Sequence, residues 1–270
     1  MNLLRSTHGA QGVAQRVASG LAQLLRGFVQ LTWPATCAAC AEPTEHPGLC
    51  SDCQAETAPR LGPRCRTCDQ ALPVEAPAHR CGRCLDRRPT FEQVFGLFDY
   101  GGPVGEVIRR AKYRGRPEAL VALGPTWLAH LPAALRLDRP EVVVPVPLHW
   151  RRLHQRGFSP PLVLADQVAK ALGVPLRGQA LRRRRSTAVQ AGLDERRRRA
   201  NLRGAFVARG PLLPADVLLV DDVFTTGATA DACAAALRSA GARRVRVLAP
   251  ALVERNPHPR EDAPRAAASG

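Results

Sequence analysis

Four Cys-x-x-Cys pairs constrain the fold of the first third of this chain more than any other feature. The pairs are Cys37/Cys40, Cys50/Cys53, Cys65/Cys68 and Cys81/Cys84. Two residues between thiolates allow a tight turn to aim both sulfurs at one ion, about 2.3 Å away in the case of zinc. Two pairs complete a tetrahedral site, so the sequence predicts two structural Zn²⁺ sites. We expect sequential pairing, although the spacing also permits interleaved pairing.

Disulfide bonds and thiol redox chemistry are the alternatives for these cysteines. No apolar run reaches the about 18 residues of a membrane span, and no secretory signal is recognisable. We therefore expect a cytoplasmic protein, in which thiols stay reduced. A redox role would need a thioredoxin-like βαβ context, which these pairs lack. The loops between the pairs suit short ribbon hairpins. The ninth cysteine, Cys233, stands among alanines and is expected to be a small buried residue.

The composition divides the chain into three blocks and a tail. Residues 1–35 have apolar side chains at helical spacing and predict an amphipathic helix that packs on the protein or, alternatively, lies on a membrane surface. Residues 36–88 hold the paired cysteines and predict a double zinc ribbon. In residues 89–255 apolar strands alternate with Ala/Leu-rich helical stretches, which predicts an α/β fold with a mostly parallel sheet. Residues 256–270 are rich in Pro, Arg and Ala and predict a disordered tail.

The elements of the third block are legible from their apolar patterns. Strands are predicted at 91–100, 142–146, 217–220 and 245–249, the middle two being buried on both faces because apolar residues follow one another without alternation. Helices are predicted at 104–113, 160–172 and 229–240, and another at 117–135 with a break at 124–125.

Residues 217–229, VLLVDDVFTTGAT, lead from a buried strand through two adjacent carboxylates into a threonine- and glycine-containing loop. A strand that ends in two acids also occurs in P-loop ATPases, but those need a Gly-Lys-Ser/Thr loop. Lys112 and Lys170 are the only lysines, and neither stands in such a loop. A dinucleotide fingerprint is absent too, because residues 101–105 lack its spacing. A plain strand-to-helix turn with a threonine cap would explain one residue but not the whole set.

Recognition of a ribose 5-phosphate uses every part of this stretch. Asp221 and Asp222 can accept hydrogen bonds from two vicinal sugar hydroxyls. The loop from Thr225 to Thr229 can surround a phosphate with N–H groups at the start of the next helix, where the helix dipole favours an anion. Gly227 permits close approach of the backbone. Ligands of open α/β sheets bind at this edge of the sheet.

The stretch closely resembles the phosphoribosyl pyrophosphate (PRPP) motif of type I phosphoribosyltransferases. From about residue 30 to 253 the chain resembles the ComF family, in which a double zinc ribbon precedes such a domain. The supporting segments are Ala111 to Gly115 (AKYRG), Val144 to Pro147 (VPVP), Arg156 to Phe158 (RGF), Gln190 and Arg198 to Phe206 (RRANLRGAF). Family members usually continue Arg-Gly-Phe with Asn-Gln. This chain has Ser159 and Pro160 there, which removes two amides that could contact a substrate.

The resemblance implies a Rossmann-like phosphoribosyltransferase domain that binds PRPP with Mg²⁺. The implied catalytic residues are Asp221 and Asp222. The implied PRPP-binding residues are Asp221, Asp222, Val223, Thr225, Thr226, Gly227, Ala228, Thr229, Pro145, Val146, Pro147, Lys112 and Arg156. The loop at 145–148 would hold pyrophosphate, and residues 182–201 would close over the site. The reaction would displace pyrophosphate from PRPP, with an acceptor that the sequence does not identify.

The resemblance also implies a role in natural competence, with single-stranded DNA and competence-machinery proteins as partners. The alternative is a non-catalytic DNA-binding competence factor whose pocket senses PRPP or is vestigial. The net charge of +16 and the arginine runs at 182–185 and 196–199 fit three interpretations that do not exclude one another. These are a solvated loop, a lid over pyrophosphate and a patch for DNA phosphates. Aromatic residues make up only 4% of the chain, so base stacking would be limited.

Overall fold

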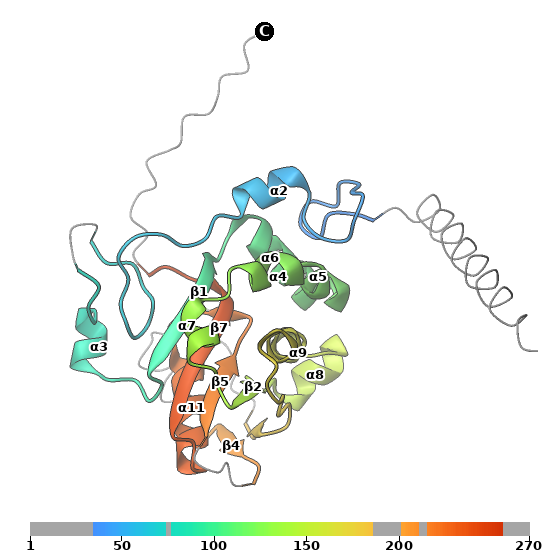
Figure 1. The fold of residues 1–270 in the computed structure, drawn as a ribbon. Coiled ribbons are helices and arrows are strands. Elements are labelled where there is room, and N and C mark those ends of the chain that lie inside the picture. The colour runs from blue at the N-terminus through green and yellow to red at the C-terminus, as the bar shows by residue number, and fades with distance from the viewer. Residues whose placement is uncertain (1–34, 74–76, 186–200, 211–214, 256–270) are drawn as a thin grey trace, which may run out of the picture.

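A computed structural model describes residues 35–73, 77–185, 201–210 and 215–255 of the chain (Figure 1). The predicted helix at 1–35 and the predicted tail at 256–270 lie outside these residues, apart from residue 35. Most of the predicted lid at 182–201 lies outside them as well.

The core of the molecule is a parallel sheet, so the predicted α/β fold is confirmed. Its strands are ordered β1 (Gln93–Asp99), β7 (Arg244–Leu252), β5 (Asp216–Val220) and β2 (Val142–Pro145), and β6 (Val223–Phe224) also pairs with β7. All these pairs are parallel. Pro145 is in register with Val220, so β2 and β5 end side by side. The residues that follow both strands therefore meet at one edge of the sheet.

Helices cover both faces of this sheet (Figure 1). On one face, Leu218, Val220 and Leu248 pack with the buried residues of α4 (Gly102–Arg114) and α9 (Pro160–Leu172). On the other, Val217, Leu219 and Val247 pack with α11 (Ala228–Ser239). Neighbouring residues of β5 thus face opposite cores, which explains its unbroken apolar run.

Several elements differ from the sequence prediction. The stretch 117–135 forms three short helices, α5 (Pro117–Ala122), α6 (Gly124–Ala129) and α7 (Ala133–Leu137), because a second break at Pro132 adds to that at 124–125. The helix α8 (Trp150–Arg156) buries none of its residues, so it has no apolar pattern to recognise. The antiparallel strands β3 (Leu181–Arg183) and β4 (Phe206–Ala208) are short and partly charged. Strand β7 continues through Pro250, a residue that usually argues against a central strand.

The two halves of the zinc ribbon pack on different parts of the sheet domain. Cys37 and Cys53 belong to the apolar cluster that includes α4 and α9. The second half lies along β1, where the Val94 N–H donates to Thr67 O at 2.9 Å. The expected hairpins between the cysteine pairs are replaced, in the described residues, by isolated bridges and by the helices α2 (Ser51–Glu56) and α3 (Gly82–Asp86). These helices begin directly after Cys50 and Cys81 and carry Cys53 and Cys84.

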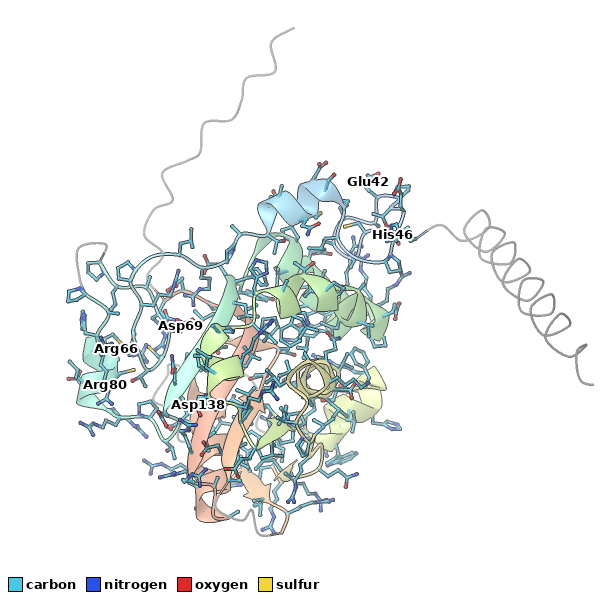
Figure 2. All side chains as sticks on the ribbon, viewed as in Figure 1. Glu42, His46, Arg66, Asp69, Arg80 and Asp138 are labelled. Atoms are coloured by element: carbon cyan, nitrogen blue, oxygen red, sulfur yellow. The ribbon has the colours of Figure 1, made fainter. Side chains whose placement is uncertain are left out.

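A buried arginine joins the ribbon to the sheet. The side chain of Arg60 is 1% exposed and forms ion pairs with Asp69 at 2.7 Å, with Asp99 at 2.9 Å and with Glu254. Figure 2 shows Asp69 beside β1, on the side of the ribbon. The three carboxylates come from the ribbon, the end of β1 and the segment after β7. A guanidinium taken out of water needs such partners, so the contact fixes the ribbon against the sheet.

Candidate functional site

The two acids predicted to bind ribose stand directly after β5. The Asp221 N–H donates to Leu248 O at 3.0 Å, which keeps the backbone in line with the sheet. The Asp222 N–H donates to Asp221 Oδ1 at 2.9 Å, so the first carboxylate is held by its neighbour's backbone. Beside them, the Val146 N–H donates to Val220 O at 2.8 Å. The predicted pyrophosphate loop at 145–147 is therefore adjacent to the acidic pair.

Lys112 compensates the charge of the pair. Its Nζ lies 2.7 Å from Asp222 Oδ1, and the two side chains are 18% and 9% exposed. Lys112 stands in the last turn of α4. Two neighbouring carboxylates at a strand end would repel one another in this partly buried place, and the ammonium lowers that cost. The family resemblance implies that Lys112 contacts PRPP itself, whereas its partner in the structure is Asp222.

Asp221 is the more perturbed of the two acids. Burial, followed by the negative charge of Asp222, raises the pKa of Asp221 to about 7, although Lys112 and Arg183 act in the opposite direction. At neutral pH the acidic pair therefore carries less than its full double charge. A ligand that offers hydroxyl donors or a cation favours the ionised form.

The predicted phosphate loop leads into the start of α11. Gly227 has φ 79° and precedes Ala228, the first residue of α11. Gly227 has no side chain to cap the helix, and the Ala228 N–H donates a long hydrogen bond, 3.4 Å, to Thr226 Oγ1. The other N–H groups of the first turn have no side-chain acceptor among the described residues, and the positive end of the helix dipole favours an anion. Thr229 lies in this first turn, and Thr225 is exposed.

Thr90 and Phe91, which follow the second cysteine cluster, pack against the phosphate loop and the start of α11. The rings of Phe91 and Phe224 pack edge to face with centroids 6.0 Å apart. A Cβ atom on Gly227 would lie 2.8 Å from Phe224 Cζ and 3.6 Å from Phe91 Cζ. The Thr90 N–H donates to Asp231 Oδ1, in the first turn of α11, at 2.6 Å. Sequence reasoning missed Phe91 and Asp231 as positioning residues, because they lie outside the motif.

Two further polar residues belong to this region, one near the acids and one after the loop at 145–148. Burial and the charge of Arg152 lower the pKa of Arg183, while Asp221 acts in the opposite direction, which indicates that Arg183 is near the acidic pair. Its guanidinium lies 5.5 Å from the ring centroid of Phe206. His149 follows the pyrophosphate loop, is buried, and accepts from the Arg151 N–H at 3.3 Å. His149 was not predicted from the sequence, because it belongs to no recognisable motif.

The remaining predicted site residues are more scattered. Val223 lies in β6 and is half-buried. The guanidinium of Arg156 lies 5.8 Å from the ring centroid of Tyr113, so Arg156 packs against the end of α4. Ser159 caps α9 without a side-chain bond, and Pro160 occupies the first turn of that helix. At this position the chain therefore offers a helix start in place of two amides.

The eight paired cysteines form two clusters, the sequential groups expected from the spacing. In each group the four Sγ atoms lie within 4.8 Å of one another. Cys40 and Cys50 are 3.7 Å apart between sulfurs, and Cys68 and Cys81 are 3.6 Å apart. Tetrahedral zinc with 2.3 Å bonds separates its sulfurs by about 3.8 Å, so both groups fit this ion. The side chain and N–H of Cys68 act against burial and lower the pKa of Cys65 to about 4, which favours a thiolate.

Comparison with known proteins gives sequence relatives over most of the chain. Residues 28–85 match the double zinc ribbon domain family, which supports structural zinc at both clusters. The DNA utilization protein YhgH of Salmonella typhimurium is 35% identical over 222 residues, 80% of this chain and 96% of that protein. The Escherichia coli K12 protein of that name is 34% identical over 224 residues, with the same coverage. Competence protein F of Haemophilus influenzae is 31% identical over 206 residues, 74% of this chain and 88% of that protein.

Solved structures give weaker likenesses. A purine phosphoribosyltransferase from Pyrococcus horikoshii Ot3 is 19% identical, covers 48% of this chain and 73% of its own, and has a TM-score of 0.33. The glutamine PRPP amidotransferase of B. subtilis, complexed with ADP and GMP, is 24% identical, covers 53% of this chain and 27% of its own, and also has a TM-score of 0.33. At these scores neither likeness adds to the assignment. In the described part of the chain, no helix has the length and apolar character that crossing a membrane requires.

Proposed function

Since the chain belongs to the ComF family, together with competence protein F and the DNA utilization protein YhgH, we propose that it is a phosphoribosyltransferase-type protein that binds PRPP and acts in DNA uptake and use. One observation carries this proposal: the acidic pair at the end of β5 is separated from the start of α11 only by the two residues of β6 and the short loop 225–227. Carboxylates for a diol and N–H groups for a phosphate thus stand in the order in which ribose 5-phosphate presents its groups. The proposal places the protein in the cytoplasm.

The proposed contacts follow from the chemistry of each group. Asp221 and Asp222 accept hydrogen bonds from the two ribose hydroxyls, and Thr225 to Thr229 hold the 5-phosphate. The loop from Pro145 to Pro147 faces the pyrophosphate, with Lys112 and Arg156 as nearby cations. Mg²⁺ bound with PRPP supplies positive charge to the leaving pyrophosphate. As the pyrophosphate departs, positive charge develops on the anomeric carbon, and the ionised pair stabilises it.

Two observations favour a second candidate, a DNA-binding competence factor that senses PRPP without catalysis. The first is that Ser159 and Pro160 replace the amides usual in the family and begin α9. The second is the net charge of +16, which attracts phosphate-bearing partners. Incubation with PRPP, Mg²⁺ and a panel of nucleobases and single-stranded DNA separates the two candidates. Release of pyrophosphate supports the transferase, and binding of PRPP without release supports the sensor.

Calorimetry with PRPP and Mg²⁺ tests the site that both candidates share. The variant is Asp221→Asn/Asp222→Asn, and the matched control is Asp166→Asn, whose carboxylate is exposed on α9 and pairs with Lys170 at 2.7 Å. We expect the double variant to lose PRPP binding and the control to keep it. Unchanged affinity in the double variant would contradict the site.

A further inference from the structure

A hollow lined by arginines lies where β1 and β7 begin and α11 ends. Its volume is about 260 Å³, and its charged lining consists of Arg80, Arg88, Arg238, Arg243, Arg244 and one carboxylate, Glu92. The first two flank α3 in the second half of the ribbon, and Figure 2 shows Arg80 beside α3. None of the acids or loop residues of the proposed PRPP site lines this hollow.

Two of the five arginines have their charge compensated from outside the hollow. Arg243 pairs with Asp216 at 3.1 Å and with Glu141 at 2.6 Å. Arg244 pairs with Asp138 at 2.7 Å and with Asp216 at 2.5 Å. These pairs fix the two guanidiniums in place, at the start of β7.

The other three arginines have no such carboxylate partner in the part of the chain that the structure describes. Among the described residues, no carboxylate lies within the 4.0 Å of an ion pair from Arg80, Arg88 or Arg238. All three side chains are exposed, and Arg238 donates only to the Ala242 carbonyl, at 3.2 Å. Arg80 and Arg88 flank α3, whereas Arg238 lies on the distant helix α11, so their approach to one hollow is a product of the fold. Like charges brought together repel one another, and an anion between them would remove that cost.

We propose that this hollow binds a phosphate group, either free or in the backbone of a single-stranded nucleic acid. The arginine fork matches phosphate oxygens, and Thr67 and Thr90 add hydroxyl donors to the lining. The volume lies below that of typical pockets for drug-sized ligands, which suits a small anion. The aromatic lining residue, Phe91, is 4% exposed and packs on Phe224. It offers no surface on which a base could stack, so the hollow recognises phosphate and not base identity.

Two probes on the full chain test the proposal. One is inorganic pyrophosphate, followed by calorimetry, in which binding to the proposed PRPP site is fitted as a separate site. The other is a labelled single-stranded oligodeoxynucleotide, followed by fluorescence anisotropy. The variant is Arg80→Gln/Arg88→Gln/Arg238→Gln. The control is Arg66→Gln/Arg136→Gln/Arg177→Gln, which removes the same charge from three exposed arginines outside the hollow. Circular dichroism and zinc content check that both fold. The variant Arg80→Lys/Arg88→Lys/Arg238→Lys keeps the charge without the fork and serves if the first does not fold.

We expect the hollow variant to bind at least one probe about tenfold more weakly than the control, as befits the loss of charge-assisted bonds. The lysine variant should fall between the two. Loss of pyrophosphate binding alone assigns a free phosphate. Loss of oligonucleotide binding, with a log–log salt slope shallower by about 2 for three neutralised contacts, assigns the nucleic acid backbone. Equal binding by the hollow variant and the control, for both probes, would overturn the proposal.

Discussion

Lys112 Nζ donates to Asp222 Oδ1 across 2.7 Å, a contact that joins the last turn of α4 to the end of β5. The chain has only one other lysine, Lys170, whose side chain is 76% exposed and pairs with Asp166 on the same helix. The two lysines therefore differ in what they hold together. Lys112 connects a helix to the edge of the sheet where the proposed ligand binds, and Lys170 connects neighbouring turns of α9.

Replacing Lys112 by Met should destabilise the protein. It leaves Asp222 largely buried without its cation, so we expect the free energy of unfolding to fall by about 1–3 kcal/mol. Lys170→Met should change it by less than about 0.5 kcal/mol, because an exposed pair on a helix contributes little. Urea denaturation of both variants measures the difference. Equal losses of stability in the two variants would show that the contact with Asp222 stabilises the protein no more than an exposed ion pair does.

Binding of PRPP should weaken as the pH falls through about 7. Asp221 has a pKa of about 7 in the folded chain, so it takes up a proton below that pH and accepts hydrogen bonds from the sugar less well. Calorimetry between pH 5.5 and 8.5 measures the trend. The phosphates of PRPP also titrate near pH 6. Asp221→Asn separates the two causes, because any pH dependence that it retains belongs to the ligand.

The same group should make stability depend on pH with the opposite sign. Its pKa in the folded chain is raised from 3.8 to about 7, so the folded state holds a proton that the unfolded state releases. The stability that this adds is complete below about pH 4 and is lost as the pH rises to about 7. Asp69, whose pKa burial raises to about 6, adds a decline of its own to both proteins, so denaturation across this range should show a larger decline in the parent chain than in Asp221→Asn. A decline of the same size in both would exclude Asp221 as its source.

Phe91 should support PRPP binding without touching the ligand. Phe91→Leu removes the ring contact with Phe224 behind Gly227, and we expect weaker PRPP binding together with a loss of about 1–2 kcal/mol in stability. The control is Phe98→Leu, which removes a buried ring that packs 5.2 Å from His130 in the core of the other face. The control should lose similar stability and keep its PRPP affinity. A matching loss of affinity in both would show that only general stability matters.

Removal of Arg60 should be the most destabilising of these changes. Arg60→Met leaves Asp69 and Asp99 without the cation that they share and Glu254 with Arg64 alone, at 2.9 Å, and we expect a loss of about 3–5 kcal/mol in the free energy of unfolding. Arg66→Met, on the exposed surface of the same ribbon, should cost less than about 0.5 kcal/mol. Chemical denaturation measures both. A small effect of Arg60→Met would show that the acids find other partners or water.

The sequence predicted the central architecture because the deciding signals are local. The buried run 217–220, the helix at 160–172 and the spacing of the paired cysteines each follow from neighbours in the chain, and the structure has all three. The predicted acids and phosphate loop are also contiguous, so their proximity needs no tertiary information. The antiparallel pair of β3 and β4 joins two three-residue strands that are too short to show an apolar pattern, so tertiary pairing decides their state.

The parts of the site that were missed depend on contacts between distant segments. The support of the phosphate loop by Phe91 and Thr90 joins residues far apart in sequence to α11. Arg60 has a partner 194 residues away, and nothing in its neighbourhood distinguishes it from the many surface arginines. In a chain this rich in arginine, sequence alone does not separate the buried structural arginines from the exposed ones.

The hydrogen bond from Val94 to Thr67 also affects how the edge of the sheet can interact with other molecules. Strand β1 is the outermost strand of the sheet on its side, and an outermost strand with free N–H and C=O groups can recruit strands of other molecules. The second half of the ribbon occupies part of that exposed rim. In a chain trimmed to the α/β domain, the edge strand β1 would lose these backbone partners, and we expect such a chain to self-associate more readily. The cysteine-rich segment would then also protect the protein against aggregation.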